Sequence, residues 1–156
     1  MPQLPRTIDL EFLYEAHVDL APPEQIGASP FGTRSIFPVT GGTFEGPRMR
    51  GVVRPGGSDW FLTLANGAGE LDVRATAETH DGALILVYYH GILDVSPEVA
   101  RRVFAGEDVS PSEYYFRTTP RFETGDERYA WLNKTVTVAT GCFGVNWVGY
   151  RVFAVV

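Results

Sequence analysis

Residues 71–90, LDVRATAETHDGALILVYYH, decide the fold class. Apolar and polar residues alternate over 71–78, and this period of two is typical of a β-strand with one buried face. Asp81-Gly82 then provides a tight turn, and the chain returns through 83–90. The stretch therefore predicts an antiparallel β-hairpin.

Similar segments continue on both sides of this hairpin. Seventeen glycines and 11 prolines divide the chain into short pieces, as expected for strands joined by tight turns. The segment 21–32 is rich in both residue types and is expected to be a loop. The other segments expected to be extended are 10–19, 35–40, 43–53, 60–65, 112–123, 129–140 and 148–156.

One short helix is expected among these strands. Ser96 offers an N-cap, Pro97 suits the first helical position and Gly106 can end the helix. The helix should cover about 97–105. Together, about 8–10 strands and one helix predict an all-β protein, a closed antiparallel barrel. A sandwich is less favoured, because polar and ring-bearing residues occur on both faces of several strands. One domain is expected over 1–156.

Charge narrows the classes of partner. The chain holds 13 Lys and Arg residues against 19 Asp and Glu residues, a net charge of −6, and it has no basic run. A nucleic-acid partner is therefore not expected, because such a partner needs a basic face to replace phosphate counterions. The same charge weighs against an anionic membrane surface. The N-terminus lacks the pattern of a leader peptide, so the cytoplasm is the expected compartment.

Metal and cofactor motifs are also missing from the sequence. Cys142 is the only cysteine, so an intrachain disulfide and a cysteine metal site are excluded. The three histidines, His17, His80 and His90, lack metal-ligand spacing. There is no dinucleotide fingerprint, phosphate loop or nucleophile elbow. We therefore expect neither a metal nor a cofactor.

Three groups of residues resemble a known family. They are FPVTGGTFEG at 37–46 with GVVRPGGSDW at 51–60, LDVR at 71–74 with DGA at 81–83, and YFRTTPRFET at 115–124 with WLN at 131–133. Together they resemble domain-of-unknown-function family 3237, also called uncharacterised protein family 0311, whose members are small bacterial and fungal proteins. The resemblance covers nearly the whole chain, and the glycine-rich first group is its most specific part.

The resemblance carries its own expectations. It implies a single-domain antiparallel β-barrel that is often found as an oligomer, so a homo-oligomer, a dimer, is expected. It implies no agreed activity. It also implies that a set of polar and aromatic residues belongs to the pattern shared by the family: Asp59, Trp60, Asp72, Arg74 and Arg117.

Two acidic positions are candidates for catalysis. Asp72 and Arg74 are two residues apart on a strand and so share a face. Inside the barrel, Arg74 would bind an oxygen and Asp72 would carry a proton; outside, they would form an ordinary salt-bridged ladder. Asp59 and Trp60 follow the turn at 55–58, where a carboxylate and a ring can contact a ligand. Alternatively, Asp59 caps the turn and Trp60 plugs the barrel end.

Further residues are candidates for substrate binding. Arg117 would be a second cation, and Glu123 would share its face unless Pro120 bulges the strand. Glu45 lies beside glycines that leave room for a ligand. The ring- and amide-bearing candidates are Tyr89, Trp131 and Asn133. For each of these residues a structural role remains the alternative. Arg117 would form a structural ion pair, and Glu45 would face solvent. The two rings would belong to the core, and Asn133 would hydrogen-bond to backbone groups.

These residues suggest a small-molecule-binding barrel, and more specifically a cofactor-independent acid–base enzyme of the isomerase, lyase or cyclase type. Its substrate would be an apolar, aromatic or polyketide-like compound with a carbonyl or carboxylate group. A carrier or sensor barrel without turnover and a purely structural oligomer remain alternatives. An enzyme requires a carboxyl group of raised pKa in a partly dry cavity. A structural protein requires a filled interior with Asp72 and Arg74 outside.

Overall fold

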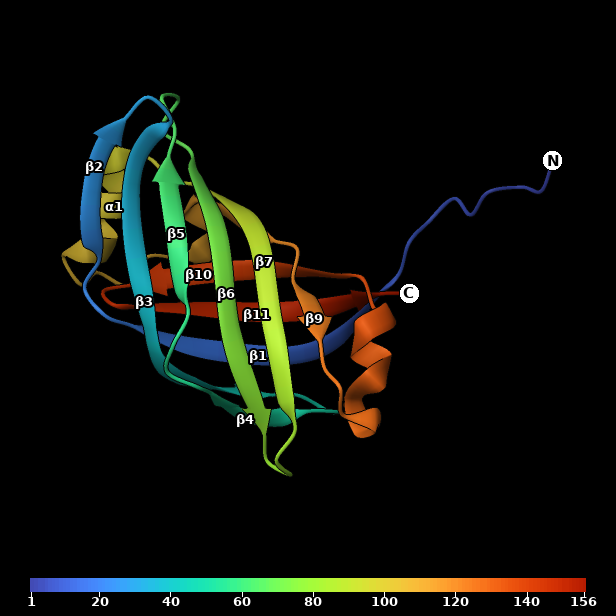
Figure 1. Cartoon of the computed structure of the whole chain (residues 1–156). Helices are drawn as coiled ribbons and strands as arrows, with labels where there is room; N and C mark the ends of the chain where they lie inside the picture. Colours follow the sequence, from blue (N-terminus) through green and yellow to red (C-terminus); the bar gives the residue numbers. More distant parts are fainter.

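Antiparallel pairing closes the chain into a β-barrel (Figure 1). The computed structural model describes residues 1–156. Its strands are β1 (Leu10–Leu20), β2 (Glu24–Ser29), β3 (Gly32–Glu45), β4 (Arg50–Val53), β5 (Ser58–Thr63), β6 (Gly69–Thr79), β7 (Leu84–Asp94), β8 (Tyr115–Thr118), β9 (Arg121–Glu123), β10 (Thr137–Gly144) and β11 (Trp147–Val155). Eight of them form the ring, in the order β1, β3, β5, β6, β7, β8, β10 and β11. The prediction of a closed all-β barrel is confirmed.

The long strand β3 belongs to two parts of the barrel wall. Its first half, residues 33–38, pairs with β5, and its second half pairs with β1 on one side and with β4 on the other. Within the second half, Gly42 has a φ of +144°, and a Cβ there would collide with the backbone carbonyl of His17. Glycine is therefore required where β3 bends against β1. The break expected between the segments 35–40 and 43–53 is therefore a bend inside one strand.

The hairpin predicted from residues 71–90 is confirmed as β6 and β7. Leu71 pairs with Gly91 and Glu78 pairs with Leu84, without a register shift between them. The apolar positions of the alternation face the interior, and Ile85 on the return strand is fully buried. This hairpin is thus one wall of the core.

The helix predicted near 97–105 is confirmed as α1 (Pro97–Phe104). The Ser96 side chain accepts a hydrogen bond from the Val99 N–H at 3.2 Å, so the N-cap forms as expected. Arg102 pairs with Glu107 and Glu113, each at 2.8 Å, and ties α1 to the following loop and to the short 3-10 helix η1 (Pro111–Glu113). None of the helices has the length and apolar character needed to cross a bilayer.

Four expected segments differ from the structure. The strand predicted over 43–53 is a hairpin, in which the end of β3 pairs with β4 and residues 46–49 form the connection. The loop predicted over 21–32 contains β2, which pairs with the first half of β3. The strand predicted over 112–123 is divided into β8 and β9, because Pro120 interrupts the ladder. The strand predicted over 129–140 begins instead as the 3-10 helix η2 (Glu127–Lys134), which Asp126 caps. In Figure 1, η2 is the orange helix, and it lies at the opposite end of the barrel from α1.

Candidate functional site

One carboxyl group points into the barrel from β5. Asp59 pairs with Phe37 on β3 and with Val73 on β6, and Val73 in turn pairs with Tyr89 on β7. Side chains in such a row project to the same face of a sheet. Because Val73 and Tyr89 are buried in the core, the row faces the interior. Asp59 therefore faces inward, and the next residue, Trp60, faces outward.

The surroundings of Asp59 hold its carboxyl group near the point of half ionisation at neutral pH. Burial is the largest cause, and it raises the pKa of Asp59 to about 7. The nearby Asp72 carboxylate also raises this pKa, whereas the Asp72 N–H, which donates to Oδ1 at 3.1 Å, and the charge of Arg34 lower it. A pKa near the working pH is what proton transfer in both directions requires.

Asp59 lies in the wall of a cavity at one end of the barrel. This mouth cavity has a volume of about 400 Å³, and 13 of its 18 lining residues are hydrophobic. Its aromatic side chains are Phe37, Phe61, Phe104, Phe116, Phe143 and Trp147. Asp59 is the only titratable residue in the lining. The volume falls in the range of small-molecule sites, which combine apolar walls with a few placed polar groups.

Helix α1 covers part of the mouth cavity. Ala100 and Phe104 line the cavity from this helix, and the Phe104 ring lies 5.9 Å from the ring of Phe143 on β10. The ion pairs of Arg102 hold the helix in this place. The Ser96 cap and the apolar face of α1, both readable in the sequence, thus shape the entrance to the site.

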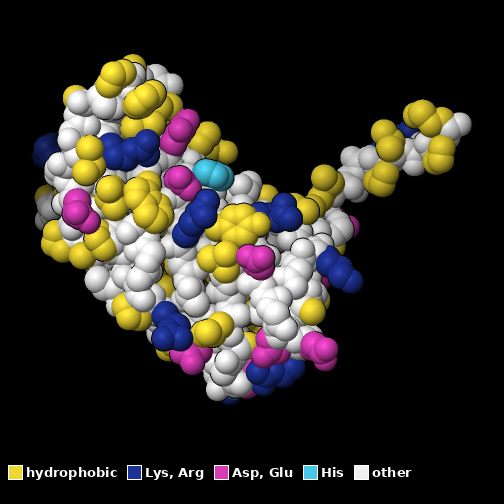
Figure 2. Space-filling model, viewed as in Figure 1, with side chains coloured by type: hydrophobic (Ala, Val, Ile, Leu, Met, Phe, Trp, Pro, Cys, Tyr) yellow, Lys and Arg dark blue, Asp and Glu magenta, His cyan; other side chains and the backbone are white.

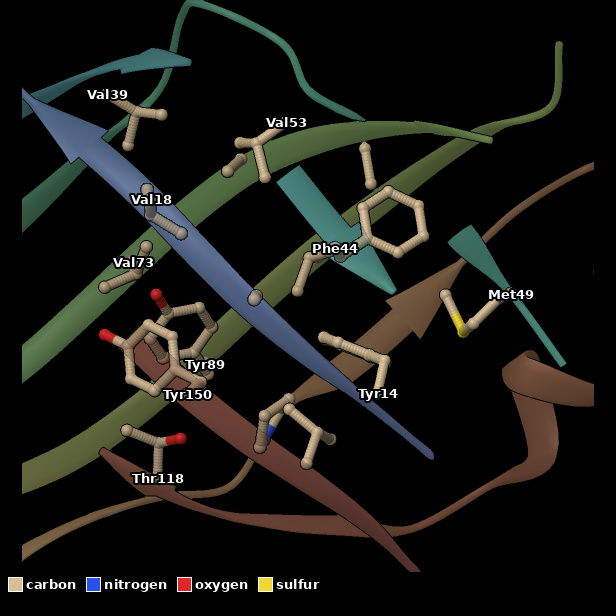
Figure 3. Close-up of a pocket in the computed structure, with 16 residues that line it drawn as sticks. Tyr14, Val18, Val39, Phe44, Met49, Val53, Val73, Tyr89, Thr118 and Tyr150 are labelled. Atoms are coloured by element: carbon tan, nitrogen blue, oxygen red, sulfur yellow. The ribbon is translucent and has the colours of Figure 1, made fainter. Parts of the chain in front are cut away.

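Two tyrosines adjoin Asp59 on the interior side. The rings of Tyr89 and Tyr150 meet edge to face at 5.3 Å, and Figure 3 shows both hydroxyl groups pointing to the same side. Burial raises the pKa of both phenols, and the negative charge of Asp59 adds to the shift. Both hydroxyls therefore stay protonated at neutral pH.

Asp72 and Arg74 lie on the outer wall, so the interpretation that places them inside the barrel is wrong. Leu71 and Val73 are the buried residues of this part of β6, and the residues between and after them must face out. Asp72 Oδ1 lies 3.9 Å from His90 Nδ1, and Arg74 is exposed. Figure 2 shows basic, acidic and histidine side chains on this wall.

Four other candidates also lie outside the mouth cavity. Trp60 on β5 is 38% exposed. The exposed charged candidates on β3, β8 and β9 are Glu45, Arg117 and Glu123. Each alternates along its strand with a buried aromatic neighbour: Phe44, Phe116 and Phe122. Strand alternation therefore turns these charged side chains to solvent.

Trp131 and Asn133 belong to η2, at the far end of the barrel from Asp59. The Arg48 guanidinium covers the Trp131 ring, 3.7 Å from its centroid. Asn133 Oδ1 accepts from the Thr124 N–H at 2.8 Å, and Asn133 Nδ2 donates to the Thr124 carbonyl at 2.9 Å. These contacts assign Asn133 to anchoring η2 beside β9.

Asn133→Ala is expected to destabilise the fold and leave the mouth cavity unchanged. The substitution removes both hydrogen bonds to Thr124, which should lower the free energy of unfolding by about 1–2 kcal/mol. Urea unfolding measures this loss, and the fluorescence of bound Nile red, a neutral apolar dye, reports on the cavity. Asn133→Asp keeps only the hydrogen-bond acceptor, so its free energy of unfolding should lie between those of the wild type and Asn133→Ala. Loss of dye binding at unchanged stability would return Asn133 to a binding role.

Sequence reasoning missed Tyr150 and most of the mouth cavity. Tyr150 lies in the predicted strand 148–156, but a strand's inward positions depend on its register with its neighbours. Phe104 and Phe143 meet only because α1 folds back over the end of β10. The only local signal for the site was the pair Asp59-Trp60 after a glycine turn.

Comparison with known proteins places this barrel in a family. Residues 8–155 match the model of a family described as protein of unknown function, DUF3237. The chain belongs to the DUF3237 family. It is 34% identical over 134 residues to a UPF0311 protein of Rhodopseudomonas palustris, covering 86% of this chain and 88% of the relative. A UPF0311 protein of Clostridium acetobutylicum is 37% identical over 107 residues, 69% of this chain and 68% of that one. The resemblance seen in the sequence is confirmed.

Solved structures share the DUF3237 barrel. A β-barrel-like protein from Acinetobacter baumannii has a TM-score of 0.87 at 38% identity, covering 99% of this chain and 100% of its own. The Rhodopseudomonas palustris protein has a TM-score of 0.90 at 32% identity, with coverage of 97% and 100%. A structure described as an enzyme from Penicillium herquei has a TM-score of 0.73 at 24% identity, covering 100% of both chains. At that identity the likeness shows a shared fold.

Proposed function

We propose that this DUF3237 protein is an acid–base enzyme that acts on an apolar small molecule in the mouth cavity, with Asp59 as the group that carries the proton. One observation supports this most: the only titratable residue of a 400 Å³ apolar cavity is a carboxyl group whose pKa is about 7. Such a perturbed carboxyl group in a concave, partly dry site is typical of catalysis.

The chemistry follows from the groups around Asp59. The Asp59 carboxylate would take a proton from a carbon next to a carbonyl group, and the electron pair of that C–H bond would move onto the carbonyl oxygen. Tyr89 and Tyr150 do not line the mouth cavity, so they would act on the Asp59 carboxyl group and not on the substrate. The side-chain amides of Gln25 and Asn146, which do line it, would donate to that oxygen as its charge grows. The protonated Asp59 would then return the proton to another carbon. Together these two proton transfers make an isomerisation. Lyase or cyclase reactions would begin with the same proton removal.

The cavity wall also points to a class of substrate. Its six aromatic side chains favour a flat or aromatic molecule, including polyketide-like compounds. Arg74 and Arg117 face solvent, and no Lys or Arg side chain lines the mouth cavity, so the cavity offers a bound carboxylate no cationic partner. A neutral carbonyl or phenol therefore fits the cavity better than a carboxylate, which the ionised Asp59 would repel.

A carrier or sensor barrel is the alternative, and Asp59 weighs against it. An apolar cavity can hold a ligand without a titratable group. Burying a carboxyl group disfavours its charged form and reduces stability, so a carrier gains little from it. The Penicillium herquei structure adds only that this fold occurs in an enzyme.

Proton exchange in heavy water tests the proposed function without a known product. Aromatic and polyketide-like ketones would be incubated with the protein in D2O, and loss of the α-proton signal would be followed by NMR. We expect catalysed exchange with an inflection near pH 7, reduced about 100-fold or more in Asp59→Asn. Asp72→Asn should retain exchange, with the inflection at lower pH because one nearby negative charge is gone. Ligand binding without exchange at any pH would instead support the carrier.

A further inference from the structure

The polar side chains of the mouth cavity lie at different depths. Asp59 is half-buried, whereas Gln25 and Asn146 are exposed at the rim. Gln25 on β2 pairs with Ser35, and Ser35 pairs with Phe61, so Gln25 lies one interior row nearer the mouth than Asp59. Ser35 Oγ donates to Gln25 Oε1 at 2.8 Å. The amide NH2 group of Gln25 is therefore the end that can donate to a ligand.

Asn146 presents the second amide, from the turn between β10 and β11. It is the only residue other than glycine with a positive φ, +62°, a conformation that asparagine adopts more readily than most residues. The Leu20 N–H donates to the Asn146 carbonyl at 2.9 Å and holds this turn against the end of β1. The side chain that lines the cavity thus extends from a fixed backbone.

The donors of the mouth cavity are uncharged. No Lys, Arg or His side chain lines it, and its side-chain N–H donors are the two amides and the Trp147 indole. Neutral donors stabilise an oxyanion less than cationic donors do. A C–H bond beside a single carbonyl group is a far weaker acid than the Asp59 carboxyl group, even at a pKa of about 7. A second carbonyl group on the same carbon supplies the acidity that such donors do not, and it brings the two proton affinities closer together.

We propose that the mouth cavity takes a neutral β-dicarbonyl compound with an aromatic substituent, and that Gln25 and Asn146 each bind one of its carbonyl oxygens. This inference rests on the proposed role of Asp59. The two oxygens face the rim, and the carbon between them faces Asp59. The C–H bond of that carbon breaks, its proton goes to the Asp59 carboxylate, and its electron pair spreads over both carbonyl groups. Asp59 then returns the proton to the carbon or to one oxygen, which gives the keto or the enol form.

Displacement of bound Nile red tests the substrate class, with benzoylacetone and butyrophenone as a matched pair that differs by one carbonyl group. If each amide binds an oxygen, benzoylacetone should bind about 10-fold more tightly than butyrophenone. If the second carbonyl group finds no donor, it loses its hydrogen bonds to water on entering the cavity. Benzoylacetone should then bind equally or more weakly. That result would overturn the proposed substrate class, whether or not Asp59 transfers protons.

Asn146→Gly is the matched variant, because glycine keeps the positive φ and removes only the amide. Its stability in urea should equal that of the wild type, and its preference for benzoylacetone should be lost. Ketonisation of benzoylacetone, followed as loss of the enol absorbance above the uncatalysed rate, should slow about 100-fold. Asn66→Gly removes an amide from a turn outside the mouth cavity and should change neither preference nor rate. An unchanged preference and rate in Asn146→Gly would contradict the role of Asn146.

Asp59→Asn separates this inference from the proposed function. The variant should keep the preference for benzoylacetone and lose the catalysed ketonisation. Ketonisation at the wild-type rate in Asp59→Asn would overturn the role of Asp59 as the proton carrier, even where the preference is retained. A wild-type protein that catalyses proton exchange but does not prefer benzoylacetone would keep the proposed function and overturn the substrate class.

Discussion

Asp59→Asn is expected to stabilise the protein at pH 8 while removing its acid–base activity. Burial raises the pKa of Asp59 from 3.8 to about 7. Between these values the folded protein holds a proton that the unfolded chain has lost, so stability falls as the pH rises from about 4 to 7. A neutral asparagine avoids this loss, and its Oδ1 can still accept from the Asp72 N–H. The gain at pH 8 should be about 2–4 kcal/mol.

Urea unfolding at several pH values measures this effect as a difference between variant and wild type. The difference should be small at pH 4, grow through pH 5 to 7 and level off above. Glu45→Gln is the matched control, because it also neutralises a carboxylate but at an exposed position outside the mouth cavity. A difference for Asp59→Asn that does not change between pH 4 and 8 would mean that the carboxyl group titrates normally. The proposed function would then lose its main support.

The sequence predicts those parts of the fold that depend on local patterns. The alternation over 71–78, the Asp81-Gly82 turn and the Ser96 cap each act within a few residues, and the structure contains all three features. The strand prediction over 129–140 is wrong in its first part, because a contact distant in the sequence decides the structure there. Its first part is η2, whose Tyr129 hydroxyl donates to Asp81 at 2.8 Å, a contact between residues 48 positions apart. Local patterns carry no information about such a contact.

The candidate site shows the same limit more sharply. The sequence correctly places Asp72 and Arg74 on one face of a strand, because alternation is local. Which face that is depends on how β6 is registered in the closed ring, and a shift of one residue would reverse it. Asp59 was identified from the turn before it, but its neighbours Tyr89 and Tyr150 come from strands that meet only in the barrel.

Phe116→Ala is expected to cause a large loss of stability. Phe116 on β8 is 1% exposed, and its ring lies 5.6 Å from the Tyr150 ring and 6.4 Å from the Phe143 ring. Gly141 on β10 leaves room for this ring, since a Cβ there would lie 2.7 Å from it. Removing the ring leaves a cavity that this wall cannot fill, so the free energy of unfolding should fall by about 3–5 kcal/mol.

The same substitution should also separate binding from proton transfer. Phe116 lines the mouth cavity and packs against Tyr150, so its loss enlarges the cavity and frees the Tyr150 ring. We expect Phe116→Ala to admit bulkier aromatic ketones while exchanging their α-protons more slowly than the wild type. Phe116→Leu, which keeps most of the volume, should lose less stability and retain most of the exchange rate. Equal exchange rates in both variants at saturating ketone would show that proton transfer does not depend on the packing of the Tyr150 ring against Phe116.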